Sequence, residues 1–128
     1  MKRPKISLVG AGNIGGVQAQ LIAQRQLGDV VLLDVVEGVP QGKVLDISHA
    51  LDGWGSNVRV VGTNDYKDTA GSDLYIVTAG IEKLVPSISH AFAMLRLLVR
   101  SATGADVTQY TTFHCGPKQP GDRDGPEE

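Results

Sequence analysis

Three glycines near the start of the chain have a spacing that suits phosphate binding. Gly10, Gly12 and Gly15 follow the pattern GxGxxG, directly after the apolar run 6–9. In such a loop the first glycine permits a sharp turn, the second leaves room for a pyrophosphate beside the backbone, and the third lets a helix pack closely on the strand. Because the free N–H groups and the dipole of that helix attract anions, no basic side chain is required. The pattern therefore predicts a dinucleotide site.

An acidic residue further along the chain favours one kind of dinucleotide. Asp34 lies in the second apolar run, 30–36, where a carboxylate can accept both hydroxyl groups of an adenosine ribose. Its charge would repel a 2′-phosphate, and Val35 and Val36 supply no arginine to pair with one. We therefore expect NAD rather than NADP. The alternative is a glycine-rich turn that binds nothing.

The elements that must position these residues alternate between strand and helix. Apolar runs predict strands over 6–9, 30–36, 58–61 and 74–77, and helical periodicity predicts helices over 13–26 and 41–51. The first run is expected to be the central strand, and Gly28 is expected to end the first helix. This alternation predicts an α/β fold, a doubly wound, Rossmann-like parallel sheet that is incomplete and has the strand order 3-2-1-4.

The two predicted helices each carry apolar residues at helical spacing. In the first helix, Ile14, Val17 and Leu21 share one face, and the glutamines are available for the side that faces water. The second helix repeats the pattern with three apolar residues on one side: Val44, Ile47 and Leu51. We expect these faces to pack on the sheet.

The last predicted strand ends on small residues. Thr78, Ala79 and Gly80 follow the run 74–77, at the edge where open α/β sheets bind their ligands. Small side chains there would let a nicotinamide ribose approach the backbone. The alternative, that Ala79 and Gly80 only form the turn, stays open.

Length and composition exclude several classes of protein. The 128 residues allow one domain, but not a nucleotide domain together with a substrate domain. A net charge of −2 favours neither nucleic acid nor an acidic membrane as partner. No segment is long and apolar enough to span a bilayer. The single cysteine, Cys115, gives no internal disulfide and no metal-site spacing, so we expect a cytoplasmic protein without a metal.

Four segments carry a resemblance to a known family. The stretches GAGNIGG (10–16), VVLLDVVEGVPQGKVLDISHA (30–50), GTNDYKDTAGSD (62–73) and IVTAG (76–80) resemble the NAD-dependent malate and lactate dehydrogenases, and most closely the malate dehydrogenases built like lactate dehydrogenase. The resemblance is confined to residues 1–82. It implies an oxidoreductase of the tricarboxylic acid cycle that transfers a hydride reversibly between malate and NAD.

The resemblance also implies roles for particular residues. The pyrophosphate would be held by Gly10, Ala11, Gly12, Asn13, Ile14 and Gly15. Asp34 would bind the adenosine ribose, and Thr78, Ala79 and Gly80 would lie near the nicotinamide. The helix over 43–51 would lie near a subunit interface, where a full-length dehydrogenase subunit or a second copy of this chain could bind.

The family pattern stops after Gly80. The family continues with a loop containing proline, lysine and glycine and two arginines that clamp the substrate carboxylate, whereas this chain has IEKLVPSISHAFAMLRLLVRSATG at 81–104. Arg96 and Arg100 match no family position, and the proton-accepting histidine followed by glycine and aspartate is missing. We expect the three histidines, His49, His90 and His114, to be packed or exposed rather than catalytic. His114 and Cys115 are adjacent, and adjacent side chains make a poor nucleophile pair.

Without those groups we predict no catalytic residue in this chain, and no turnover by the chain alone. Three segments are expected: an NAD-binding Rossmann half at 1–82, a divergent amphipathic helix at 83–103 and a disordered tail at 104–128. The abrupt change suggests the hypothesis that the reading frame or splicing of a malate dehydrogenase gene changes near residues 81–84. A non-catalytic NAD-binding or partner module and an inert truncated product are the alternatives.

Overall fold

The computed structural model describes residues 2–78, 93, 96–97, 99–101 and 103–104. Its elements in chain order are β1 (Lys5–Val9), α1 (Asn13–Gln24), β2 (Asp29–Leu33), α2 (Val39–Leu51), the 3-10 helix η1 (Asp52–Trp54), β3 (Val60–Thr63), the 3-10 helix η2 (Tyr66–Thr69) and β4 (Leu74–Val77). No helix among the described residues is long and apolar enough to cross a bilayer.

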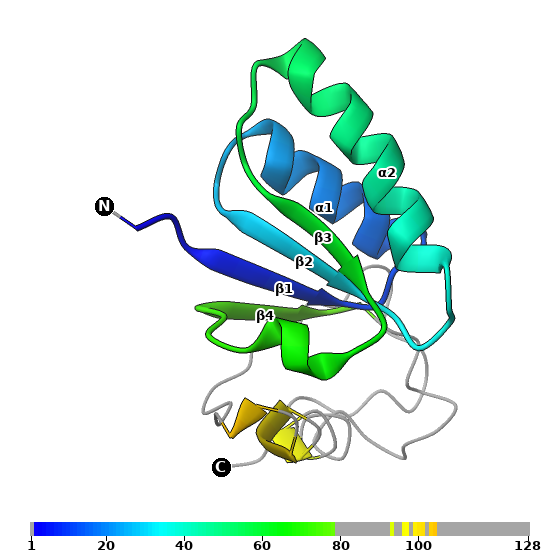
Figure 1. Cartoon of the computed structure of the whole chain (residues 1–128), viewed down its shortest axis with the longest axis vertical. Coiled ribbons are helices and arrows are strands. Elements are labelled where there is room, and N and C mark those ends of the chain that lie inside the picture. Colours follow the sequence, from blue (N-terminus) through cyan, green and yellow to red (C-terminus); the bar gives the residue numbers. More distant parts are fainter. Residues whose placement is uncertain (1, 79–92, 94–95, 98, 102, 105–128) are drawn as a thin grey trace, which may run out of the picture.

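The four strands form one parallel sheet with the order β3-β2-β1-β4. The expected α/β fold, the strand order 3-2-1-4 and the inner position of the first strand are therefore confirmed. Helices α1 and α2 lie against each other on one side of the sheet (Figure 1). All strands run in the same direction, so their carboxyl ends meet at one edge, where the candidate site lies.

The core has one part on each face of the sheet. Leu8 and Leu32 are fully buried on the face covered by α1 and α2, where Ile47 and other helix residues pack on them. Because side chains alternate along a strand, Val9 and Leu33 point to the other face. There they form a second cluster with the fully buried Val99, so the strands are apolar on both sides.

The prediction for the buried face of α1 is wrong. Ile14, Val17 and Leu21 are 62%, 56% and 40% exposed. The buried residues of α1 are three small ones and a single large one: Gly15, Ala19, Ala23 and Ile22. Close approach of the helix to the strands leaves room for glycine and alanine but not for a row of large side chains. In contrast, α2 buries the three residues that its periodicity predicts, Val44, Ile47 and Leu51.

The prediction that Gly28 ends the first helix is also wrong. The helix ends at Gln24, and Gln26 adopts the left-handed conformation with φ 53°. The Leu27 N–H donates to the Ile22 carbonyl and the Gln26 N–H to the Ala23 carbonyl, both at 3.1 Å, which is a Schellman motif. Gly28 serves packing instead, because a Cβ atom there would lie 2.6 Å from the Pro4 carbonyl oxygen.

Several boundaries differ from those expected. Strand β2 ends at Leu33, so Asp34 follows the strand and the exposed Val35 and Val36 lie outside it. Helix α2 begins two residues early, since proline is tolerated in a first helical turn, and Pro40 lies in that turn. Strand β3 covers 60–63 instead of 58–61. Strand β4 has the predicted bounds.

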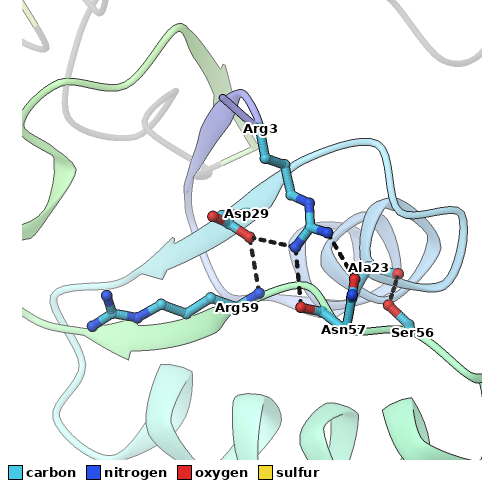
Figure 2. A network of polar contacts seen from close by, with 6 residues as sticks. All are labelled: Arg3, Ala23, Asp29, Ser56, Asn57 and Arg59. Atoms are coloured by element: carbon cyan, nitrogen blue, oxygen red, sulfur yellow. Dashed lines mark hydrogen bonds and ion pairs between the residues drawn. The ribbon is translucent and has the colours of Figure 1, made fainter. Parts of the chain in front are cut away.

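The edge of the sheet opposite the candidate site is fixed by a polar network (Figure 2). The Arg3 guanidinium contacts an Asp29 carboxylate oxygen at 3.3 Å and donates to the Asn57 carbonyl at 3.0 Å and to the Asn57 side chain at 2.7 Å. The same Asp29 oxygen accepts the Arg59 backbone N–H at 2.9 Å. Ser56 donates to the Ala23 carbonyl at 2.7 Å. These contacts join the starts of β1, β2 and β3 to the end of α1.

Most of the expected segment 83–103 and all of the tail 105–128 lie outside the described residues. Within 93–103, the described positions are helical, and Val99 packs in the cluster with Val9 and Leu33. The three-segment division therefore stays a prediction.

Candidate functional site

The carboxyl ends of β1, β2 and β4 bring together the residues that the sequence analysis selected. The Gly10 N–H donates to the Leu33 carbonyl at 2.8 Å, which ties the turn after β1 to the end of β2. The Thr78 hydroxyl donates to the Gly10 carbonyl at 3.1 Å, and Thr78 follows β4 directly. One turn thus contacts both neighbouring strands.

The three glycines of the loop each have a separate structural reason. Gly10 has φ 111°, a conformation that strains other residues. A Cβ atom on Gly15 would lie 1.9 Å from the Gly10 carbonyl oxygen and 2.9 Å from the Thr78 hydroxyl, so no side chain fits there. A Cβ atom on Gly12 would meet nothing within 4 Å. The backbone beside Gly12 is therefore open, as a bound pyrophosphate requires, and the loop fits a dinucleotide.

Two backbone N–H groups hold the carboxylate of Asp34. Its Oδ2 atom accepts from the Ala11 N–H at 2.7 Å and its Oδ1 atom accepts from the Val36 N–H at 3.0 Å. A carboxylate oxygen has two acceptor positions, so each oxygen can still accept a hydroxyl group. The side chain is partly buried and sits beside the glycine loop, where it can accept ribose hydroxyls.

Sequence reasoning missed a residue that shapes the turn after β2. The Asn64 side-chain amide donates to the Asp34 carbonyl at 2.8 Å and to the Val36 carbonyl at 3.1 Å. Gln41, in the first part of α2, donates to the Asn64 side-chain oxygen at 2.7 Å. The available signal was an asparagine directly after β3, at the same sheet edge as Asp34.

Tyr66 is the first residue of η2. It packs beside the cluster of Val9 and Leu33. Burial raises the pKa of the Tyr66 phenol above 10.0, and the negative charge of Asp34 raises it further. The phenol is therefore neutral beside the carboxylate throughout the neutral pH range.

A lysine of α2 also reaches the loop, although the loop itself requires no basic side chain. The Lys43 ammonium group donates to the Gly12 carbonyl at 2.9 Å. The two residues are 31 positions apart, so spacing could not reveal the contact. The only signal was the lysine in the segment VEGVPQGK.

The remaining candidates are distributed as follows. Asn13 and Ile14 are exposed in the first turn of α1, and Ala11 is fully buried. Ala79, Gly80, His90, His114 and Cys115 lie outside the described residues. His49 is exposed on α2, and Arg96 and Arg100 line an open depression with Ala93 and Leu97. Within the described ranges, no group of three histidine, cysteine or acidic residues could hold a metal ion.

Sequence comparison identifies relatives of this chain. The family model described as "lactate/malate dehydrogenase, NAD binding domain" matches residues 4–85. A malate dehydrogenase of Desulforudis audaxviator is 44% identical over 111 residues, which are 87% of this chain and 36% of that protein. A malate dehydrogenase of Trichlorobacter lovleyi is 61% identical over 83 residues, 65% of this chain and 26% of that protein. The chain thus spans about a third or less of these relatives.

A second family model, the LUD domain, matches residues 68–128. This match overlaps the first over 68–85 and falls mostly outside the described residues. The alignment of 111 residues with the Desulforudis audaxviator protein also runs past residue 85.

Solved structures with the same fold come from the same group of enzymes. A Cryptosporidium parvum lactate dehydrogenase, solved with lactic acid and nicotinamide adenine dinucleotide, has a TM-score of 0.61 and 51% identity, covering 62% of this chain and 25% of its own. Another structure of lactate dehydrogenase from that organism has a TM-score of 0.69 and 41% identity, and the match covers 80% of this chain and 32% of that one. Plasmodium falciparum malate dehydrogenase, solved in complex with NADH, has a TM-score of 0.58 and 43% identity. The match covers 60% of this chain and 26% of that one.

The family match covers well over half of the chain, and the strand order and glycine loop agree with it. The resemblance proposed from the sequence is confirmed, and the expected cofactor, NAD, is the cofactor of this family's matched domain. The chain belongs to the lactate/malate dehydrogenase family, and its residues 4–85 correspond to the family's NAD-binding domain.

Proposed function

We propose that this chain binds NAD(H) where β1, β2 and β4 end, as the cofactor-holding part of a malate dehydrogenase-type oxidoreductase. The observation that carries the proposal is the hydrogen bond between the Ala11 N–H and the Asp34 carboxylate. It holds a ribose acceptor at a fixed position beside a phosphate-binding loop, so one rigid unit offers both halves of an adenosine diphosphate site.

Each selected residue has a role in this proposal. The loop Gly10, Ala11, Gly12, Asn13, Ile14 and Gly15 holds the pyrophosphate. Asp34 accepts the adenosine ribose hydroxyls and disfavours a 2′-phosphate by charge repulsion. Thr78, Ala79 and Gly80 are assigned to the nicotinamide ribose, from their place in the sequence directly after β4. NAD supplies the hydride acceptor, and the residues of this chain bind and orient it.

We further propose that the 128 residues by themselves do not oxidise malate. Hydride transfer from a 2-hydroxy acid needs a base within hydrogen-bonding reach of the hydroxyl and a cation for the carboxylate. His49 is exposed on α2, whereas the proposed cofactor site lies at the carboxyl edge of the sheet, and the arginine loop of the family has no counterpart after Gly80. The chain therefore supplies cofactor binding without the substrate clamp.

The binding proposal is tested by titrating NADH into the purified chain and following its fluorescence. Saturable binding is expected, with weaker binding of NADPH and of NADH to Asp34→Ala. Asp34→Asn is the matched control for charge, because it keeps the size of the side chain and should bind NADPH better than the native chain does. Absence of NADH binding by a folded chain would contradict the proposal, and failure of the chain to fold would favour an inert product. NAD-dependent malate oxidation above a no-protein control would contradict the predicted inactivity.

A non-catalytic partner module is the second candidate function. It is favoured by the exposed apolar residues of the two helices on one side of the sheet: Ile14 and Val17 on α1 and Leu45, 57% exposed, on α2. We propose that another dehydrogenase subunit, a second copy or a full-length one, covers the helix at 43–51. Co-elution with a full-length subunit, lost in Leu45→Lys, would support it. Unchanged co-elution of that variant would refute this surface.

A cytoplasmic location is proposed with these functions. It rests on the lone cysteine, Cys115, which suits a reducing compartment. Cell fractionation tests it.

A further inference from the structure

The side chain of Lys43 crosses from α2 to the first turn of α1. Its ammonium group donates to the Gly12 carbonyl at 2.9 Å, and Gly12 is the residue that caps the N-terminus of α1. The same carbonyl also accepts the Gly16 N–H at 2.9 Å. The Gly12 carbonyl is therefore satisfied by the helix itself, and Lys43 is not needed to pair it.

Gly16 provides the space that Lys43 occupies. A Cβ atom on Gly16 would lie 3.1 Å from the Lys43 Cδ atom and 3.2 Å from its Nζ atom, which is closer than ordinary contact. Gly16 follows the GxGxxG pattern but is not part of it, so the phosphate loop does not account for this glycine. The structure accounts for it as the seat of a lysine side chain.

The position of the ammonium group is electrostatically unfavourable without an anion. A helix N-terminus carries partial positive charge, which favours acidic and disfavours basic neighbours. The first turn of α1 contains no acidic residue, and no ion pair joins Lys43 to a carboxylate in the described part of the chain. The ammonium group and the positive end of the helix dipole therefore both lie at the first turn of α1, next to the glycine loop.

From these contacts we infer that Lys43 is a further residue of the cofactor site, and that its charge binds the pyrophosphate of the dinucleotide. This inference rests on the proposed function, because it assigns the pyrophosphate to the glycine loop. Gly16 leaves room for the ammonium group, and the Gly12 carbonyl orients it. The negatively charged diphosphate then pairs with both Lys43 and the positive end of the helix dipole. The loop then combines backbone donors with one full positive charge.

Binding of three ligands to four chains tests the inference. NADH and ADP-ribose contain the pyrophosphate, and adenosine does not. Lys43→Met removes the charge and keeps a long unbranched side chain, while Lys43→Arg keeps the charge. Lys67→Met is the matched control, since Lys67 is exposed on η2, outside the proposed site. Titrations are run at low and high salt, because salt screens such an attraction.

Lys43→Met is expected to weaken NADH and ADP-ribose binding by about three- to tenfold, with adenosine within twofold of the native chain. Its ADP-ribose affinity should depend less on salt. Lys43→Arg should retain most of the affinity, and Lys67→Met all of it.

Unchanged ADP-ribose binding by Lys43→Met would overturn the inference and leave the proposed function intact. Equal weakening of adenosine, or failure of Lys43→Arg to retain binding, would overturn it as well by assigning Lys43 a packing role. Absence of NADH binding by the native chain would refute the proposed function itself. If Lys43→Met does not fold, Gly16→Ala tests the role of Lys43 instead. Its Cβ atom crowds the ammonium group, so this variant should bind ADP-ribose more weakly and adenosine as well as the native chain does. Equal effects on both ligands would count against the inference.

Discussion

Asp34 and Ala11 are 23 residues apart in sequence, and the Asp34 carboxylate accepts the Ala11 backbone N–H at 2.7 Å. This bond joins the turn after β2 to the glycine loop after β1, so the two parts of the proposed cofactor site cannot shift independently. The carboxylate is anchored a second time by the Val36 N–H. The site is thus organised before a ligand arrives, which lowers the entropic cost of binding.

Gly15 and Gly12 should respond differently to alanine. Gly15→Ala places a Cβ atom 1.9 Å from the Gly10 carbonyl, and we expect a loss of about 2–3 kcal/mol in the free energy of unfolding, measured by urea denaturation. Gly12→Ala is the control, because its Cβ atom meets nothing within 4 Å. It should keep most of the stability and lose NADH affinity. Equal destabilisation by the two substitutions would contradict the assigned roles.

Asn64 should act on binding through Asp34. Asn64→Ala removes the two hydrogen bonds to the Asp34 and Val36 carbonyls, so the turn that aims the carboxylate loosens. We expect NADH affinity to fall by about threefold, for a loss of about 0.5–1 kcal/mol. Gln41→Ala, which removes only the contact to Asn64, should have a smaller effect. The idea fails if Asn64→Ala binds NADH as tightly as the native chain.

Tyr66 should make the fold sensitive to alkaline pH. Burial first, and then the charge of Asp34, raise the pKa of Tyr66 above its usual 10.0. The folded state then holds the phenolic proton more tightly than the unfolded state, so this contribution is fully present below pH 10 and is lost as the pH rises through the folded-state pKa. Melting temperatures measured from pH 8 to 11 should fall more steeply for the native chain than for Tyr66→Phe. Parallel curves would rule out the effect.

The network around Arg3 should contribute little stability, and its contribution should depend on salt. The Arg3 and Asp29 side chains are 33% and 38% exposed, so solvent screens the ion pair. Arg3→Met should lower the free energy of unfolding by about 0.5–1 kcal/mol. The difference from the native chain should shrink between low and high salt. Lys2→Met at the exposed neighbouring position is the control.

The sequence was sufficient to predict the strand order and the main residues of the proposed site. A glycine loop between a buried strand and a helix favours one topology, and an acid that ends the second apolar run lies at the same edge. The sequence did not show that β2 stops at Leu33, before Asp34. The strand 74–77 was bounded correctly because polar residues precede it and small residues follow it.

Other features depend on contacts that no local pattern contains. Apolar periodicity chose the wrong face of α1, since the distance to the sheet selects glycine and alanine there and Ile14, Val17 and Leu21 stay outside. Gly28 was assigned to a helix end because its packing against Pro4 is not visible in sequence. Asn64 contacts Asp34, 30 residues away in sequence, and Lys43 contacts Gly12, 31 residues away.

The two faces of α1 differ in how much sequence change they can accept. On the inward face, a Cβ atom on Gly15 would overlap the Gly10 carbonyl and Ala19 is fully buried, so added bulk is costly there. The outward positions Ile14, Val17 and Leu21 have no such constraint from the sheet. Substitutions at Val17 and Leu21 can therefore change the outer surface of this helix while its inner face keeps the glycine loop in place.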